Sequence, residues 1–165
     1  MATLRMCRHL LASEGRTRRR FSREKLQAIE AAIAAAEART SGEIRFVIET
    51  ALEVADLWAG LTPRDRAVQT FSDLHIWNTE LRNGVLIYVL VADRDVEILA
   101  DRGAAAVIPP ADWEAVCRRM EEDFRAGRFA EGAIAGVEAV GGLLERRFPR
   151  SSADRNELPN QPALL

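Results

Sequence analysis

Two neighbouring segments near the middle of the chain show the clearest pattern of apolar and polar positions. Residues 85–91 form an unbroken apolar run rich in Val, Leu and Ile, which is typical of a strand covered on both faces. Residues 96–101 alternate between apolar and more polar positions, as expected of a partner strand near a sheet edge. Because Asp93 and Arg94 leave room only for a tight turn, the two segments predict a β-hairpin with helices above and below its first strand.

Further elements are predicted on either side of this hairpin. Residues 43–50 alternate with a period of two and predict a strand that has one more polar face and is less central than residues 85–91. Apolar residues at helical spacing, with Ser22 and Thr62 as N-caps, predict helices over about residues 22–38, 62–74, 111–126 and 129–148. We therefore expect a three-layer α/β/α sandwich with a small mixed sheet that contains the hairpin and has helices on both faces.

The predicted topology brings acidic residues together at one edge of the sheet. The helix between the first two strands is a crossover, and right-handed crossovers join parallel strands, so both strands end at the same edge. Ligands of open α/β sheets usually bind where parallel strands end. The candidate ligands for Ca²⁺ or Mg²⁺ there are Glu49, Glu53, Asp56, Asp93 and Asp95, with Arg94 placed to hold a phosphate oxygen. A solvated hairpin also displays acidic residues near its turn, so this alternative stays open.

Polar residues are also predicted at the opposite edge of the sheet. Asn78, Asn83 and Arg102 form a candidate recognition cleft for a carboxylate, a phosphate or a peptide segment. The alternative is structural: Asn83 and Asp101 bind loop amides, and the neighbouring glycines supply backbone freedom.

A set of motifs along the chain resembles a known family. The set comprises Asn83-Gly84, Arg94, Gly103 and the run FRAGRF over residues 124–129. This pattern is similar to that of the TPM domain, which is shared by a thylakoid lumen protein, a photosystem II repair protein and a worm receptor modulator. The resemblance implies an α/β/α sandwich, often attached to a membrane, with weak acid phosphatase activity and calcium binding in some members.

Charge divides the chain into a basic head and an acidic body. The first 23 residues hold seven arginines and one glutamate, a charge of +6, which leaves −8 for the remainder because the net charge is −2. We expect a basic head over residues 1–20, a single TPM-like domain over 21–149 and an extended tail over 150–165, which contains two prolines and no periodicity.

The head allows several interpretations. Leu4, Cys7 and Leu11 share one helical face and are surrounded by basic residues, so a short amphipathic helix could lie on an anionic membrane surface. The alternatives are that the head docks on the acidic body or frays into solvent. Nucleic acid is not an expected partner, because the acidic body repels phosphates and no aromatic residues alternate with the arginines.

The sequence contains none of the common catalytic motifs. The chain has no glycine-rich phosphate loop, no Gly-x-Ser-x-Gly motif and no Cys-x-x-Cys motif, and its two histidines are isolated. It has no apolar run long enough to span a membrane and no signal-peptide pattern, so we expect a cytoplasmic protein, with peripheral attachment to the inner face of the membrane as a further hypothesis. The sequence does not require a cofactor. The acidic residues at the sheet edge suggest Ca²⁺ or Mg²⁺ as candidate bound ions.

We interpret the chain as a non-enzymatic accessory or interaction module that binds a protein partner. In one version of this hypothesis, the partner is a membrane protein or the module associates peripherally with the membrane itself. The alternative is a weak acid phosphatase that depends on a divalent cation.

Overall fold

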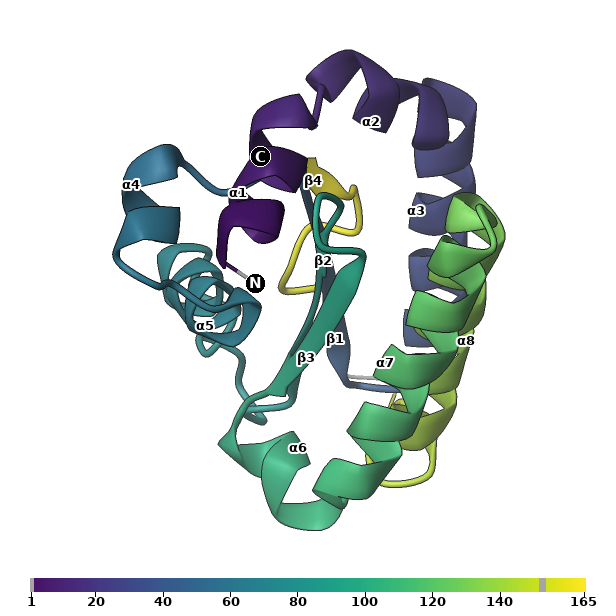
Figure 1. The fold of residues 1–165 in the computed structure, drawn as a ribbon. Coiled ribbons are helices and arrows are strands. Elements are labelled where there is room, and N and C mark those ends of the chain that lie inside the picture. Colours follow the sequence, from purple (N-terminus) through teal and green to yellow (C-terminus); the bar gives the residue numbers. More distant parts are fainter. Residues whose placement is uncertain (1, 152–153) are drawn as a thin grey trace.

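The structure is a computed structural model that describes residues 2–151 and 154–165, the first two of these by their backbone alone. Residue 1 of the predicted head and residues 152–153 of the predicted tail lie outside the described part. A central sheet separates two helical layers (Figure 1), so the predicted three-layer α/β/α fold with a mixed sheet is confirmed.

The described elements range from a strand of 2 residues to a helix of 17 residues. The helices are α1 (Ala2–Leu11), α2 (Glu14–Arg20), α3 (Arg23–Glu37), α4 (Val54–Trp58), α5 (Pro63–Asp73), α6 (Arg102–Val107), α7 (Pro110–Arg125) and α8 (Phe129–Glu145). The strands are β1 (Glu43–Glu49), β2 (Gly84–Leu90), β3 (Asp95–Ala100) and β4 (Ala163–Leu164).

The sheet has the order β3-β2-β1-β4. β1 and β2 are parallel, and Glu49 lies opposite Leu90, so the two strands end at the same edge as predicted. β2 and β3 form the predicted antiparallel hairpin. The expectation that β1 would be less central than β2 is wrong, because β4 of the tail pairs with β1 in parallel and makes it an inner strand.

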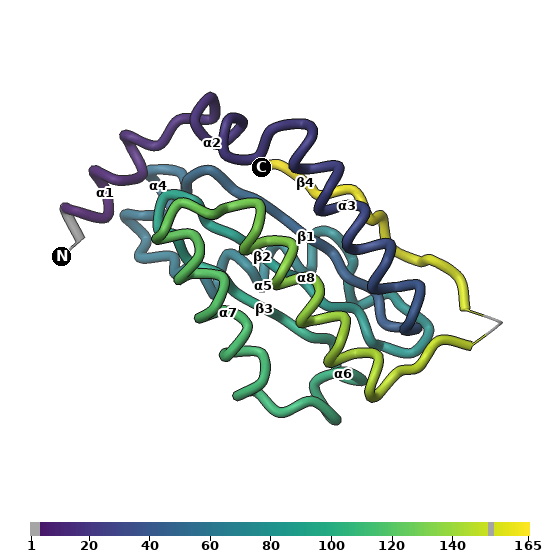
Figure 2. The backbone as a smooth tube through the Cα atoms, turned by 90° about the vertical axis from the view of Figure 1, so that its right-hand side faces the viewer, coloured from purple at the N-terminus to yellow at the C-terminus, as the bar shows by residue number. Residues whose placement is uncertain are grey.

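Alternate residues of the strands feed two separate cores. On one face, Ile44, Phe46 and Ile87 pack with α3, α7 and α8. On the other face, Val47 and Leu86 pack with α5. Figure 2 shows α3, α7 and α8 lying side by side over the sheet. This division explains why β2, whose residues are all buried, reads as a continuous apolar run.

Local signals set the ends of several helices. The Ser22 side chain accepts a hydrogen bond from the Lys25 amide at the start of α3. Thr62 and Asp65 form a reciprocal capping box at the start of α5. Gly127 ends α7 with a φ of +83°, a conformation that suits glycine.

Candidate functional site

The edge where β1 and β2 end is closed by the hairpin turn of β2 and β3. The Val91 amide donates to the Glu49 carbonyl at 2.9 Å, and the Ala92 amide donates to the Thr50 carbonyl at 3.0 Å. These bonds extend the β1–β2 ladder beyond both strands and fix the position of Asp93. Its side chain is 8% exposed.

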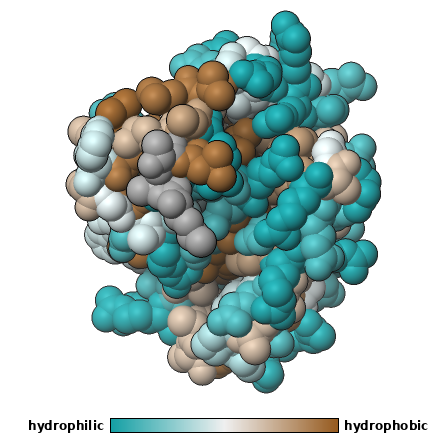
Figure 3. Space-filling view, viewed as in Figure 1, coloured by the Kyte–Doolittle hydropathy of each residue, from teal (hydrophilic) through white to brown (hydrophobic). Residues whose placement is uncertain are grey.

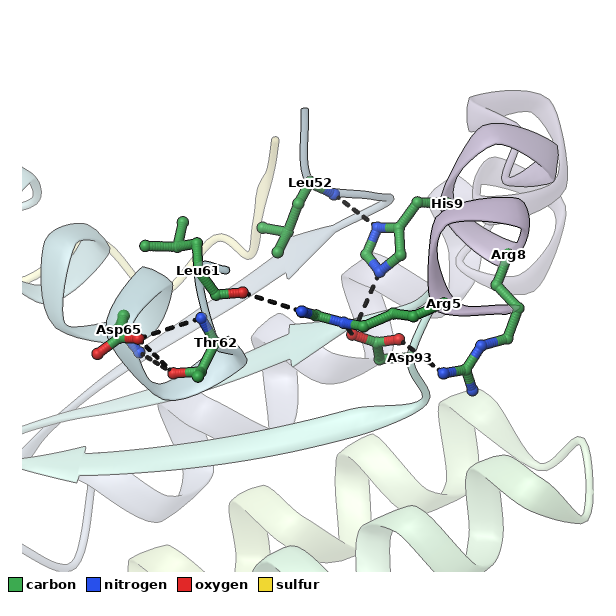
Figure 4. A network of polar contacts seen from close by, with 8 residues as sticks. All are labelled: Arg5, Arg8, His9, Leu52, Leu61, Thr62, Asp65 and Asp93. Atoms are coloured by element: carbon green, nitrogen blue, oxygen red, sulfur yellow. Dashed lines mark hydrogen bonds and ion pairs between the residues drawn. The ribbon is translucent and has the colours of Figure 1, made fainter. Parts of the chain in front are cut away.

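Three side chains of α1 converge on this carboxylate (Figure 4). Arg5 donates from Nε to Oδ2 at 2.8 Å, and the Arg8 guanidinium lies 3.3 Å from Oδ1. His9 Nε2 lies 3.2 Å from Oδ2. Arg5 also donates to the Leu61 carbonyl at 3.0 Å. The basic head therefore docks on the acidic body around the Asp93 carboxylate, which is one of the alternatives that the sequence left open.

Both ring nitrogens of His9 face polar groups of the body. The Leu52 amide donates to His9 Nδ1 at 3.0 Å. The other nitrogen, Nε2, is the atom that faces Asp93. His9 is 5% exposed and connects a backbone amide on one side to the carboxylate on the other.

This docking turns the apolar side of α1 outward. Leu4, Leu10 and Leu11 are 70%, 63% and 69% exposed. The neighbouring helix α4 adds Val54 and Trp58, which are 46% and 79% exposed. Figure 3 shows apolar residues gathered over α1 and α4. We call these five residues the apolar patch. Soluble proteins usually bury such side chains, so a gathered set of them indicates a surface that contacts a partner or a membrane.

A second carboxylate of the predicted cation site, Glu49, is also engaged by the protein itself. It accepts a hydrogen bond from the Tyr88 hydroxyl at 2.6 Å and two from Arg66 Nε at 2.9 and 3.2 Å. Burial, together with the hydrogen bond to Glu49, raises the pKa of Tyr88. Glu49 thus joins β1, β2 and α5.

The remaining predicted cation ligands are Glu53, Asp56 and Asp95. Glu53 is the exposed N-cap residue of α4 and Asp56 lies in its first turn. Asp95 begins β3; burial, then the charges of Glu97, Glu121 and Asp93, raises its pKa to about 6. Within residues 2–151 and 154–165, no three His, Cys, Asp or Glu side chains are placed to hold a metal ion.

The opposite edge of the sheet has mainly structural contacts. The Asn83 side chain is buried and donates from Nδ2 to the Ser41 carbonyl at 2.8 Å, which joins the loop before β2 to the start of β1. Asp101 accepts from the Arg102 amide at 2.7 Å and caps α6. Asn78 and the first residue of α6, Arg102, are exposed. Arg94 lies at the other edge, in the hairpin turn.

A basic groove lies beside the docked helix. It has a volume of about 570 Å³ and lies between α1, α2, the hairpin turn and the end of α7. We call it the arginine groove, because its lining includes Arg8, Arg16, Arg20, Arg94 and Arg125. Burial, and after it the charges of Arg94 and Arg16, lowers the pKa of Arg20.

Sequence reasoning found Arg94 and Asp93 but missed the residues that surround them. Arg5, Arg8 and His9 were recognised only as polar residues around an amphipathic helix, and the signal for their role was the opposite charge of head and body. No sequence pattern indicated the pairing of Glu49 with Tyr88 and Arg66. These residues lie far apart in the sequence and meet only because α5 packs on the sheet.

Comparisons with known proteins agree with this architecture. The model of the TPM domain matches residues 17–143. The NMR structure of the BA42 protein from the psychrophilic bacterium Bizionia argentinensis is 37% identical, covers 86% of this chain and 93% of its own, and superposes with a TM-score of 0.76.

Two more distant structures share the fold. The N-terminal domain of a P. gingivalis protein is 22% identical, with 77% of this chain and 78% of that chain covered and a TM-score of 0.60. The N-terminal domain of the cg2496 protein from Corynebacterium glutamicum is 17% identical, with 82% and 80% covered and a TM-score of 0.57. The search of curated proteins found no match. On the strength of the family match and the BA42 likeness, this chain belongs to the TPM domain family.

Proposed function

We propose that this protein is an accessory module that associates peripherally with an anionic membrane surface through α1 and α4. The observation that carries the proposal is the orientation of α1. Its charged side contacts Asp93, and its leucines face outward. An amphipathic helix that only stabilised the fold would bury the leucines and expose the charges.

The chemistry around the apolar patch suits a membrane surface. Arg18 and Arg19 of α2 follow α1 directly and are exposed, so they can contact anionic headgroups. Trp58 has the apolar ring and polar N–H that favour the boundary between headgroups and acyl chains. Among the helices that the structure describes, none has the length and apolar run needed to cross a bilayer.

Vesicle sedimentation tests the proposal with two matched variants. Leu10→Gln with Leu11→Gln removes two leucines of the patch and keeps good helix formers. Leu81→Gln with Val107→Gln removes two apolar residues that are exposed elsewhere, at 51% and 43%. We expect the first pair to lower vesicle binding at least tenfold, because apolar burial drives interfacial binding. Equal binding by both variants and the unchanged protein would refute the proposal.

The alternative of a cation-dependent phosphatase has less support from the geometry. Arginines already engage Asp93 and Glu49, which leaves few free oxygens for a cation. Hydrolysis of a generic phosphate ester with Ca²⁺ or Mg²⁺ tests this alternative. Activity that disappears on replacing Asp93 and Asp95 by alanine would favour the phosphatase over the accessory module.

A further inference from the structure

We infer that the arginine groove is a headgroup site, which takes the phosphodiester of an anionic phospholipid while the acyl chains lie against the apolar patch. This inference rests on the proposed membrane association and gives it a chemical specificity. Besides residues of α1, the groove includes residues of α2, α7 and the hairpin turn, which lie outside the apolar patch.

The groove concentrates positive charge without matching negative charge. Among the described residues that line it, Asp93 is the single carboxylate, and this side chain is already shared by Arg5, Arg8 and His9. Arg125 pairs with Glu121 at 2.6 Å. Besides burial, the charges of Arg94 and Arg16 act on Arg20 and lower its pKa, so these three guanidinium groups repel one another. An anion bound in the groove would relieve this repulsion.

Arg20 and Arg94 differ in how the fold constrains them. Arg20 lies with its guanidinium carbon 4.7 Å from the centre of the Phe129 ring, a cation–π arrangement that restricts the side chain. Arg94 lies in the exposed hairpin turn, and its side chain makes no hydrogen bond or ion pair with the described residues. A phosphate would therefore displace no protein partner from Arg94, and a guanidinium group can bind two phosphate oxygens in a fork geometry.

The groove and the apolar patch are continuous. Leu11 lines the groove and is also 69% exposed as a member of the patch. A phosphate in the groove would therefore place the attached glycerol and acyl chains beside the leucines of α1. This continuity favours a lipid headgroup over a soluble anion as the ligand.

The test compares two arginine pairs on vesicles of phosphatidylcholine with and without an anionic lipid. Arg16→Ala with Arg94→Ala removes two charges from the groove. Arg119→Ala with Arg147→Ala removes two charges from exposed positions on α7 and after α8, outside the groove. At roughly a five- to sixfold change per arginine near an anionic surface, we expect the groove pair to weaken anionic-vesicle binding about thirtyfold and the control pair less than about threefold.

The outcomes separate this inference from the proposed function. If both arginine pairs weaken binding equally while Leu10→Gln with Leu11→Gln abolishes it, the membrane association stands and the headgroup site is refuted. If the protein binds no vesicle, both fail. NMR titration with glycerophosphate tests whether the groove prefers a soluble phosphate to a lipid headgroup. If the groove binds this soluble anion as tightly as the protein binds vesicles, it is a site for free phosphate and the inference is overturned. Circular dichroism of each variant checks that the fold is retained.

Discussion

Replacing Asp93 by asparagine tests whether this carboxylate holds α1 on the body. The substitution keeps the shape of the side chain and removes its charge. Arg5 donates to Asp93 at 2.8 Å from a side chain that is 25% exposed, and a partly buried hydrogen bond between charged groups contributes about 1.5–3 kcal/mol. Arg8 is half exposed, so its ion pair adds only about 0–1 kcal/mol.

These contributions predict that Asp93→Asn weakens the docking of α1 by about 2–3 kcal/mol, because the amide oxygen still accepts one hydrogen bond. The local opening of α1 should then become about 30- to 150-fold more frequent. Native-state hydrogen exchange measures this directly as a loss of protection at the amides of α1. The amides of β2 should keep their protection, because they belong to the buried sheet.

Asp73→Asn is the matched control. Asp73 is exposed at the end of α5 and forms no ion pair within the described part of the chain. Its replacement removes the same charge and should leave the exchange of α1 unchanged. Equal protection of α1 in the Asp93 variant and the unchanged protein would refute the docking mechanism.

Three further predictions concern the stability of the body. Burial raises the pKa of Glu37 to about 8; the folded state therefore favours the protonated form, and the free energy of unfolding should be highest below pH 4.5 and fall as the pH rises through 8, by at most about 5 kcal/mol. In Glu37→Gln urea titrations most of the loss above pH 6 should disappear, whereas the loss that comes from Asp95, whose pKa is raised by burial to about 6, remains below that pH. An unchanged slope above pH 6 would contradict the assignment. Tyr88→Phe removes the hydrogen bond to Glu49 and should cost about 1–3 kcal/mol in chemical denaturation, whereas an unchanged midpoint would show that the bond contributes nothing. Gly84→Ala should cost more than about 3 kcal/mol, because the added Cβ would lie 2.2 Å from the Ile76 carbonyl oxygen; near-normal stability would contradict the close approach.

The sequence was sufficient to predict the framework of the fold. The apolar run of β2, the short turn at Asp93-Arg94 and the capping residues Ser22 and Thr62 are local signals, and each agrees with the element that formed. The parallel pairing of β1 and β2 followed from the handedness of crossovers alone.

Elements that depend on distant contacts could not be predicted in this way. β4 has two residues, too few for any periodicity, and it is held because the Leu158 amide donates to the Glu43 side chain at 2.9 Å and Arg45 donates to the Pro159 carbonyl at 2.8 Å. The short helix α6 is also absent from the predicted elements. Its cap, Asp101, was assigned to a loop.

The acidic edge shows the same limit for the candidate site. Strand direction correctly placed Glu49 and Asp93 at one end of the sheet. The partners of these carboxylates come from α1 and α5, and no spacing rule connects them. Charge asymmetry between head and body indicated that the two attract each other, but the choice of Asp93 depends on the position of α1 beside the hairpin turn.

Two positions on the protein can carry a spin label that reports whether α1 faces the membrane. Cys7 is exposed on α1, on the helical face that it shares with Leu4 and Leu11. Burial raises the pKa of Cys117 to about 12, so a thiol reagent at neutral pH reacts with Cys7 in preference. The variant Cys7→Ser with Val107→Cys supplies a control position on α6.

The most direct measurement is the accessibility of a nitroxide label on Cys7 to oxygen and to a water-soluble nickel complex, with and without anionic vesicles. Since α1 presents its apolar side to lipid in our account, vesicles should raise the oxygen accessibility at Cys7 and lower the nickel accessibility, while a label at position 107 stays aqueous. A Cys7 label that remains as accessible to nickel when vesicles are present would contradict the claim that α1 faces the membrane.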